Sequence, residues 1–144
     1  MATGERVDPY LNYNFLIEMD GITQAGFKEC SGLDSTTEIV EYREGGENSA
    51  SRKLWGRTSY SDITLKRGLT DSDELWQWRS KVVSGKSDRR NGSIIVLDSE
   101  GKEAVRWNFV NAWLSKWEGP SFDSTANDVA IETLTIAHEG IQRA

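Results

Sequence analysis

Two side chains in this 144-residue sequence, Cys30 and His138, are of the types that most often perform covalent or metal chemistry. Each is the only residue of its kind, so neither type can form a His or Cys cluster around a metal ion. A nucleophilic dyad between them stays open, but no catalytic motif surrounds Cys30, and an isolated cysteine is usually a small buried apolar residue. We therefore expect no catalytic residue, no metal ligand and no cofactor.

Other candidate sites are weaker. Gly45-Gly46 lacks the spacing and the Lys-Ser/Thr ending of a phosphate-binding loop, so a flexible turn is the simpler interpretation. Carboxylates are abundant, and any acidic protein brings two of them together by chance. Ser51-Arg52-Lys53 and Arg89-Arg90 are short basic clusters that form either solvated surface or a contact with an acidic protein face.

The six tryptophans divide into two groups. Five lie in segments with a regular apolar pattern, where core packing is favoured over a sugar-binding platform: Trp76, Trp78, Trp107, Trp113 and Trp117. Leu54 and Trp55 lie instead in a polar segment, where an apolar pair needs cover from a partner protein.

Composition excludes several protein classes. An apolar share of 37% with 14 aromatic residues argues against a disordered chain, and no segment approaches the roughly 18 apolar residues of a membrane span. One cysteine cannot form a disulfide framework, so a cytosolic origin fits. A net charge of −6 disfavours nucleic-acid binding, although residues 45–90 carry 10 basic and 6 acidic side chains. The length predicts one domain, residues 1–144.

Most local patterns indicate strands. An alternating run over residues 13–19 ends at Asp20-Gly21, which predicts a hairpin returning through residues 22–29. Ser31-Gly32 indicates a turn or bulge before a strand over residues 35–43 that lacks clean alternation. Residues 44–60 are rich in Gly, Ser and charge and longer than a normal connection, which is typical of functional loops. A further strand is expected over residues 62–67.

The second half contains one helix and three more strands. Asp71 and Glu74 have capping-box spacing, and an apolar stripe runs to Val83 before Gly85, which predicts a helix over about 71–84. Strands are expected over residues 93–97, 104–117 and 129–138. Residues 104–117 are too long for one straight strand, so a bend is expected near Asn111. The fold class is mainly β: two packed antiparallel sheets, as a β-sandwich or barrel, with one flanking helix.

Three segments are similar to one protein family. Residues 26–33 (GFKECSGL) resemble the "aGF…sGL" signature of tail tube proteins from contractile phage tails and related injection systems. Residues 41–48 (EYREGGEN) resemble that family's "eyreGG.N" segment, and residues 63–68 with 75–78 resemble its "itLkrG…lw.W" segment. Order and spacing agree over most of the chain, with greatest similarity to the inner tube proteins of extracellular contractile injection particles. Cys30 departs from the usual small aliphatic residue.

The resemblance implies a structural subunit and not an enzyme. It implies hexameric rings stacked head to tail into a hollow tube, which a contracting sheath drives through a target membrane. The implied partners are other copies of the chain, the sheath protein, baseplate, spike and tube-terminating proteins, and a luminal cargo protein. The resemblance implies no sequence-specific binding of nucleic acid. Assembly in the bacterial cytoplasm is implied, after which the protein is part of a phage-tail-like particle, released or cell-attached, or of a virion. The tail tube of a DNA-injecting phage and a soluble carbohydrate-binding β-sandwich are the alternatives.

In that family an extended hairpin arm contacts neighbouring subunits, and here it corresponds to the segment at about 44–60. The expected subunit-interface residues all lie in this segment: Glu44, Gly45, Gly46, Asn48, Arg52, Lys53, Leu54, Trp55 and Arg57. The basic residues are expected to meet acidic residues of a neighbouring subunit.

Overall fold

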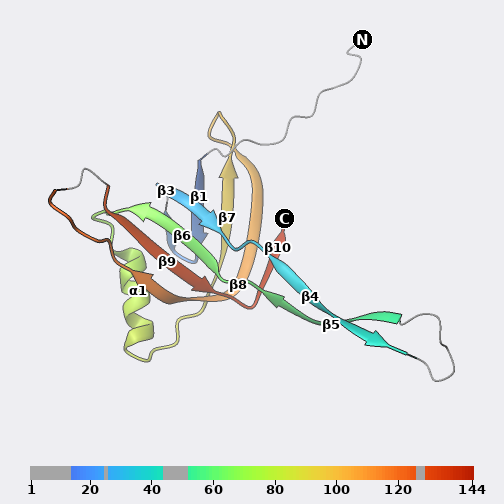
Figure 1. Cartoon of the computed structure of the whole chain (residues 1–144). Coiled ribbons are helices and arrows are strands. Elements are labelled where there is room, and N and C mark those ends of the chain that lie inside the picture. Colours follow the sequence, from blue (N-terminus) through green and yellow to red (C-terminus); the bar gives the residue numbers. More distant parts are fainter. Residues whose placement is uncertain (1–13, 25, 44–51, 126–128) are drawn as a thin grey trace, which may run out of the picture.

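The computed structural model describes residues 14–24, 26–43, 52–125 and 129–144. Within these residues the chain forms ten strands and one helix (Figure 1). In chain order they are β1 (Phe15–Met19), β2 (Ile22–Gln24), β3 (Phe27–Ser31), β4 (Ser35–Tyr42), β5 (Arg52–Tyr60), β6 (Ile63–Gly68), α1 (Glu74–Val83), β7 (Arg90–Leu97), β8 (Glu103–Glu118), β9 (Ile131–Ala137) and β10 (Gly140–Arg143).

Eight strands form two antiparallel layers that share β8. The strand order is β2-β1-β7-β8-β9-β6-β3, and β10 also pairs with β8. The first part of β8 pairs with β7 and β10, whereas its last part pairs with β9, which continues to β6 and β3. Because β8 bends between these two sets of partners, the layers pack face to face, which confirms the predicted mainly-β fold of two packed sheets (Figure 1).

The bend in β8 lies at the predicted place. Asn111 has φ 53°, a left-handed conformation that its short polar side chain tolerates. The buried side chains change parity there: Val105 and Phe109 face the core before the bend, and Ala112 and Leu114 face it after the bend. One residue in an unusual conformation therefore lets a single strand present apolar side chains to the same core from both layers.

The first hairpin is only partly as predicted. Asp20-Gly21 forms the expected two-residue turn, with Met19 paired to Ile22 and Gly21 at φ 80°. The returning strand was expected to continue to Glu29, but this is wrong, because the chain turns at Gly26 (φ 84°). After that turn, β3 pairs with β6 in the other layer.

Helix α1 covers one side of the core and is shorter than predicted. It begins at Glu74, and the expected capping box between Asp71 and Glu74 is wrong, because Asp73 holds the N-cap position. Gly85 at φ 82° ends the helix as predicted, and its amide donates to the Val82 carbonyl. No helix in the described residues is long and apolar enough to cross a membrane.

The core lies between the layers and under α1. Its buried residues are Ile17, Met19, Ile22, Phe27, Ile63, Leu65, Leu75, Trp78, Ile94, Phe109, Ala112, Leu114, Leu134 and Ile136. Strands β4 and β5 contribute none of them, so the layers and α1 form a core without that hairpin.

The turn between β3 and β4 requires a glycine at position 32, which is the glycine of the "sGL" part of the family signature. Its φ is 91°, and a Cβ atom there would lie 2.0 Å from the Asp62 carbonyl oxygen. Gly101 has a similar φ of 82° with open space around it, so it serves as a matched control. We expect Gly32→Ala to lower the free energy of unfolding by about 1–3 kcal/mol more than Gly101→Ala, because only the former adds a clash. Urea denaturation measures the difference, and equal losses would contradict the clash.

Candidate assembly surface

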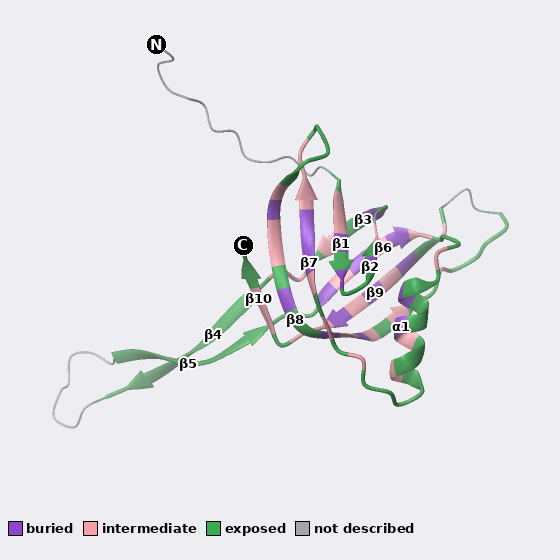
Figure 2. Cartoon of the chain, turned by 180° about the vertical axis from the view of Figure 1, so that it is seen from behind, coloured by how far each residue is buried: buried purple, intermediate pink, exposed green. Residues whose placement is uncertain are grey.

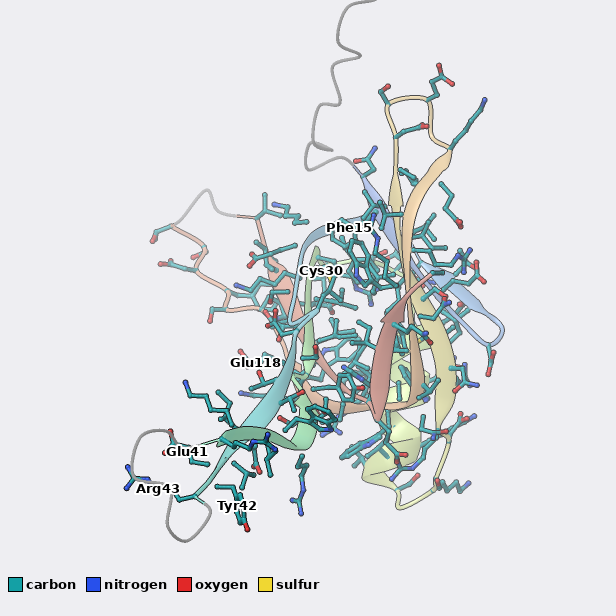
Figure 3. All side chains as sticks on the ribbon, turned by 90° about the vertical axis from the view of Figure 1, so that its right-hand side faces the viewer. Phe15, Cys30, Glu41, Tyr42, Arg43 and Glu118 are labelled. Atoms are coloured by element: carbon teal, nitrogen blue, oxygen red, sulfur yellow. The ribbon has the colours of Figure 1, made fainter. Side chains whose placement is uncertain are left out.

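Strands β4 and β5 form a hairpin, here called the arm, that projects from the body (Figures 1 and 2). Within the described residues they pair only with each other, and every residue of both strands is exposed except the half-buried Gly56. Figure 3 shows Glu41, Tyr42 and Arg43 out along the arm, whereas Phe15 and Cys30 lie in the body. An isolated two-stranded hairpin is marginally stable in water. The arm therefore gains stability from any partner that covers it.

The arm carries apolar side chains on both faces. Residues directly opposite each other in an antiparallel pair share a face. Val40 pairs with Leu54, and the adjacent Ile39 pairs with Trp55, so the two pairs lie on opposite faces. Trp55 is 86% exposed and Ile39 is 67% exposed. Apolar exposure on both sides of a thin hairpin is typical of a segment that is enclosed by other chains.

Charged side chains flank these apolar pairs. Lys53 is opposite Glu41, and Arg52 is opposite Tyr42. Arg57 lies beside the irregularity in pairing between Thr37 and Ile39. An apolar centre with charged neighbours has the composition of a protein–protein interface.

The structure corrects the expected arm boundaries. The expected hairpin arm is present and residues 52–60 form its strand β5, but the hairpin begins at Ser35, well before residue 44. Arg52, Lys53, Leu54, Trp55 and Arg57 all lie on β5, whereas Glu44, Gly45, Gly46 and Asn48 lie outside the described residues. The sequence interpretation missed Ile39, Val40 and Tyr42 on β4. Their signal was the lack of alternation over residues 35–43, which indicates a strand with no buried face.

His138 supports the root of the arm through both of its ring nitrogens. Its Nδ1 accepts a hydrogen bond from the Gly140 amide at 3.2 Å, which leaves Nε2 to donate to the Ser61 carbonyl at 2.9 Å. Its ring also lies 5.8 Å from that of Tyr60, at the end of β5. Both imidazole nitrogens therefore fix the position where the arm leaves the body.

Cys30 is partly buried beside the core. Desolvation by burial raises the pKa of its thiol to about 11. A nucleophilic cysteine needs a lowered pKa, because the thiolate is the reactive form. The environment of Cys30 therefore favours the protonated thiol, which opposes the dyad interpretation. Among the residues described, no group of three His, Cys, Asp or Glu side chains is arranged to hold a metal ion.

A second apolar surface lies beside α1, and we call it the α1 groove. It is lined by Trp76, Arg79, Ser80, Val83 and Trp117 and has a volume of about 300 Å³. Trp76 is 50% exposed, so the expectation that it packs in the core is wrong, whereas Trp78 is buried as expected. The Trp76 and Trp117 rings meet edge to face at 5.2 Å, which does not give the flat platform of a sugar site.

Comparison with known proteins identifies the family of the chain. The family model of the T4-like virus tail tube protein gp19 matches residues 11–142. The chain belongs to the tail tube protein family. This confirms the family resemblance found in the three sequence segments. No curated protein matches the chain at a significant level.

Solved structures share the fold of this tube protein. A chain in the sheath–tube complex of an extracellular contractile injection system (PVC, extended state) is 27% identical, with a TM-score of 0.84 over 94% of this chain and 91% of that chain. A chain of the anti-feeding prophage tube-terminating cap is 25% identical, with a TM-score of 0.85 over 100% and 99%. Hcp1 from Flavobacterium johnsoniae is 16% identical, with a TM-score of 0.58 over 92% and 95%, a likeness in fold alone.

Proposed function

We propose that this tube protein forms six-membered rings that stack head to tail into the inner tube of a contractile injection particle. The whole chain, residues 1–144, acts as one tube domain. The observation that carries the proposal is the arm, which within the described residues exposes apolar pairs on both faces and is suited to cover by another chain. Its role is to bind neighbouring subunits, as expected for a tube built from identical copies.

The interfaces in such a tube are heterologous. In a ring, one surface of each subunit meets a different surface of the next, and the rotation closes after six copies. Stacking of rings repeats without closing, which gives a tube of open length. A protruding arm on one side of each subunit fits this arrangement, because a heterologous contact needs a donor and a separate acceptor.

The remaining partners follow from this role. The outer wall contacts a sheath protein, the ends contact baseplate, spike and terminating proteins, and the lumen holds a cargo protein. The tube assembles in the bacterial cytoplasm and later pierces a target membrane when the sheath contracts. This role needs no catalytic group, metal or cofactor, so the chain acts as a structural protein and not as an enzyme.

Native mass spectrometry of the purified protein tests the ring. We expect a dominant species with six times the mass of the 16.2 kDa chain, together with larger multiples of that ring. A protein that stays monomeric at all concentrations would contradict the proposal.

A DNA-injecting phage tail is the second candidate, because the matching family model is that of a T4-like virus tail tube protein. Both functions use the same kind of tube, and neighbouring genes distinguish them. Genes for a capsid and a terminase beside the gene for this chain would favour the phage tail. Their absence, with genes for a sheath and a cargo protein nearby, would favour the injection particle.

The basic side chains of β5 are expected to steer assembly. Charge complementarity affects association rates more than affinity, and an exposed pair is worth only about 0.2–1 kcal/mol. Each ring would present every such pair six times, so small contributions act together. We expect reversal of Arg52 and Lys53 to Glu to slow tube growth at least tenfold, measured by light scattering, with the melting temperature nearly unchanged.

Salt and a matched variant check the electrostatic origin. Screening at about 1 M salt shortens the Debye length to about 3 Å, so growth of the wild-type protein should slow as well. Lys102→Glu is the matched variant, because it makes the same charge change as Lys53→Glu at a lysine outside the arm whose side chain is 77% exposed. It should slow tube growth less than the Arg52/Lys53 reversal does. A rate of tube growth that changes neither with salt nor with the Arg52/Lys53 reversal would show that charge does not control assembly.

A further inference from the structure

The α1 groove is a rigid concave surface, because α1 is fixed to the body by buried side chains and hydrogen bonds. Leu75 and Trp78, on the inner side of α1, are 1% exposed each. The Trp78 indole donates to the Asp88 carbonyl at 2.7 Å. Arg79 donates to the Leu114 carbonyl at 2.8 Å, which ties α1 to β8. A groove fixed in this way needs little reorganisation to accept a side chain.

The exposed walls of the groove are apolar and aromatic. Trp76 is 50% exposed and Val83 is 72% exposed, although both lie on a helix whose inner side is well packed. Its volume of about 300 Å³ accommodates one indole ring. Aromatic side chains in such pockets are the usual anchors of protein–protein interfaces.

The arm presents a convex surface of matching chemistry. The indole of Trp55, with Ile39 opposite it, is the most exposed large apolar side chain in the described residues at 86%. Figures 1 and 2 show that the arm and α1 lie on opposite sides of the body. The arm therefore points away from the groove of its own chain, and a contact between them joins two copies.

We propose that Trp55 of one copy docks in the α1 groove of a second copy. This inference rests on the proposed function and adds the acceptor surface for the arm. A protruding donor and a concave acceptor on opposite sides of one subunit give the heterologous contact that repeats around a ring or along a tube.

A second hollow in the body is a poorer acceptor. It lies over β1, β7 and β8, and its lining mixes apolar residues such as Met19, Ile22 and Phe109 with the polar Glu18, Asp20, Asn91, Ser93 and Asn108. An indole placed there would remove water from carboxylate, amide and hydroxyl groups without giving each a new hydrogen bond, which costs free energy. Val110 also lines this hollow, so a cysteine at this position represents it in the cross-linking experiment below.

Cross-linking tests the contact directly. Glu41 is diagonal to Trp55 on the same face of the arm, so Glu41→Cys labels this face and keeps the indole. Paired with Ser80→Cys in the α1 groove, it should react with a short bis-maleimide to give covalent multimers after assembly. Native Cys30 contributes little background, because its raised pKa leaves almost no thiolate at neutral pH. Glu41→Cys alone and Glu41→Cys with Val110→Cys are the controls.

The outcomes separate this inference from the proposed function. Cross-linked multimers at least tenfold more abundant for the Ser80 pair than for the Val110 pair would support it. Normal rings or tubes without Ser80 cross-links, whether or not Val110 reacts, would overturn the inference and leave the proposed function standing. Wild-type protein that forms no rings would overturn both.

A single substitution gives a second measurement. We expect Val83→Asp to slow tube growth at least tenfold, because the change puts a charge against the docked indole. Val129→Asp, at a side chain 63% exposed and outside the groove, is the matched control. Equal growth of the two variants would contradict the docking.

Discussion

Replacing residues 38–57 with Asn-Gly should abolish tube formation and leave the body of the protein folded. Thr37 pairs with Thr58, and their hydroxyl oxygens are 2.9 Å apart, so a two-residue turn can join these positions. Asn-Gly is the sequence that such a turn prefers. The arm contributes no residue to the core, so its loss removes little buried apolar surface. In the proposed tube a neighbouring subunit covers the arm, and the shortened chain has no arm to insert.

Two readouts separate assembly from folding in this variant. Circular dichroism and urea denaturation should give a free energy of unfolding within about 1 kcal/mol of the wild type, because the deletion leaves the core intact. Electron microscopy should show neither rings nor tubes at concentrations where the wild type forms them. A replacement of Ser99 and Glu100 by Asn-Gly, in the β7–β8 turn, controls for loop engineering. Normal tubes from the shortened chain would refute the role of the arm.

The second large effect is expected at a buried ion pair beside the core. Arg67 and Glu132 lie on β6 and β9 with side chains 3% and 10% exposed, and Arg67 Nε donates to a Glu132 carboxylate oxygen at 3.1 Å. The guanidinium also lies 5.9 Å from the Phe27 ring centroid and 5.8 Å from that of Trp117. Gln24 Oε1 accepts a further hydrogen bond from it at 3.3 Å. Arg67 therefore connects β6 and β9 to aromatic side chains on the two flanking strands, Phe27 on β3 and Trp117 on β8.

Glu132→Gln should lower the free energy of unfolding by about 3–5 kcal/mol, because it leaves a buried guanidinium without its carboxylate. Removing both charges, as in Arg67→Met with Glu132→Gln, should recover part of the lost free energy of unfolding. Lys66 is adjacent on the same strand, and its pair with Glu29 is 3.7 Å long and largely exposed. Lys66→Met should cost less than about 1 kcal/mol. Urea denaturation that finds Glu132→Gln no worse than Lys66→Met would contradict this account.

Local signals in the sequence predicted the elements whose form depends on neighbouring residues. Asp20-Gly21 predicted the first turn and Gly85 predicted the end of α1. The length of the apolar segment after Ala104 predicted the bend at Asn111. Each depends on backbone conformations that few residue types tolerate, so residue identity is informative.

Local signals could not predict strand β5, although the family resemblance implied a hairpin arm in this segment. Its residues have no buried face, so the pattern that identifies strands by alternating burial is absent. It forms because β4 pairs with it across the hairpin, which is a non-local contact. Strand β10 was also missed, because its four residues gain strand geometry from pairing with β8.

The candidate surface was predicted by residue type and only partly by position. The exposed Leu54 and Trp55 stood out because a polar segment gives apolar side chains no local cover. Ile39 was missed, since an apolar residue in a strand is normally assigned to a core. The α1 groove was missed as well, because Trp76 follows the helical apolar pattern although its side chain is half exposed.

Cryo-electron microscopy of the assembled wild-type protein would show the proposed tube and the position of the arm in one measurement. We expect a hollow tube of stacked six-membered rings in which density for each arm continues onto a neighbouring subunit, with the Trp55 side chain enclosed. Particles without rings, or six-membered rings in which every arm remains exposed to solvent, would contradict this expectation.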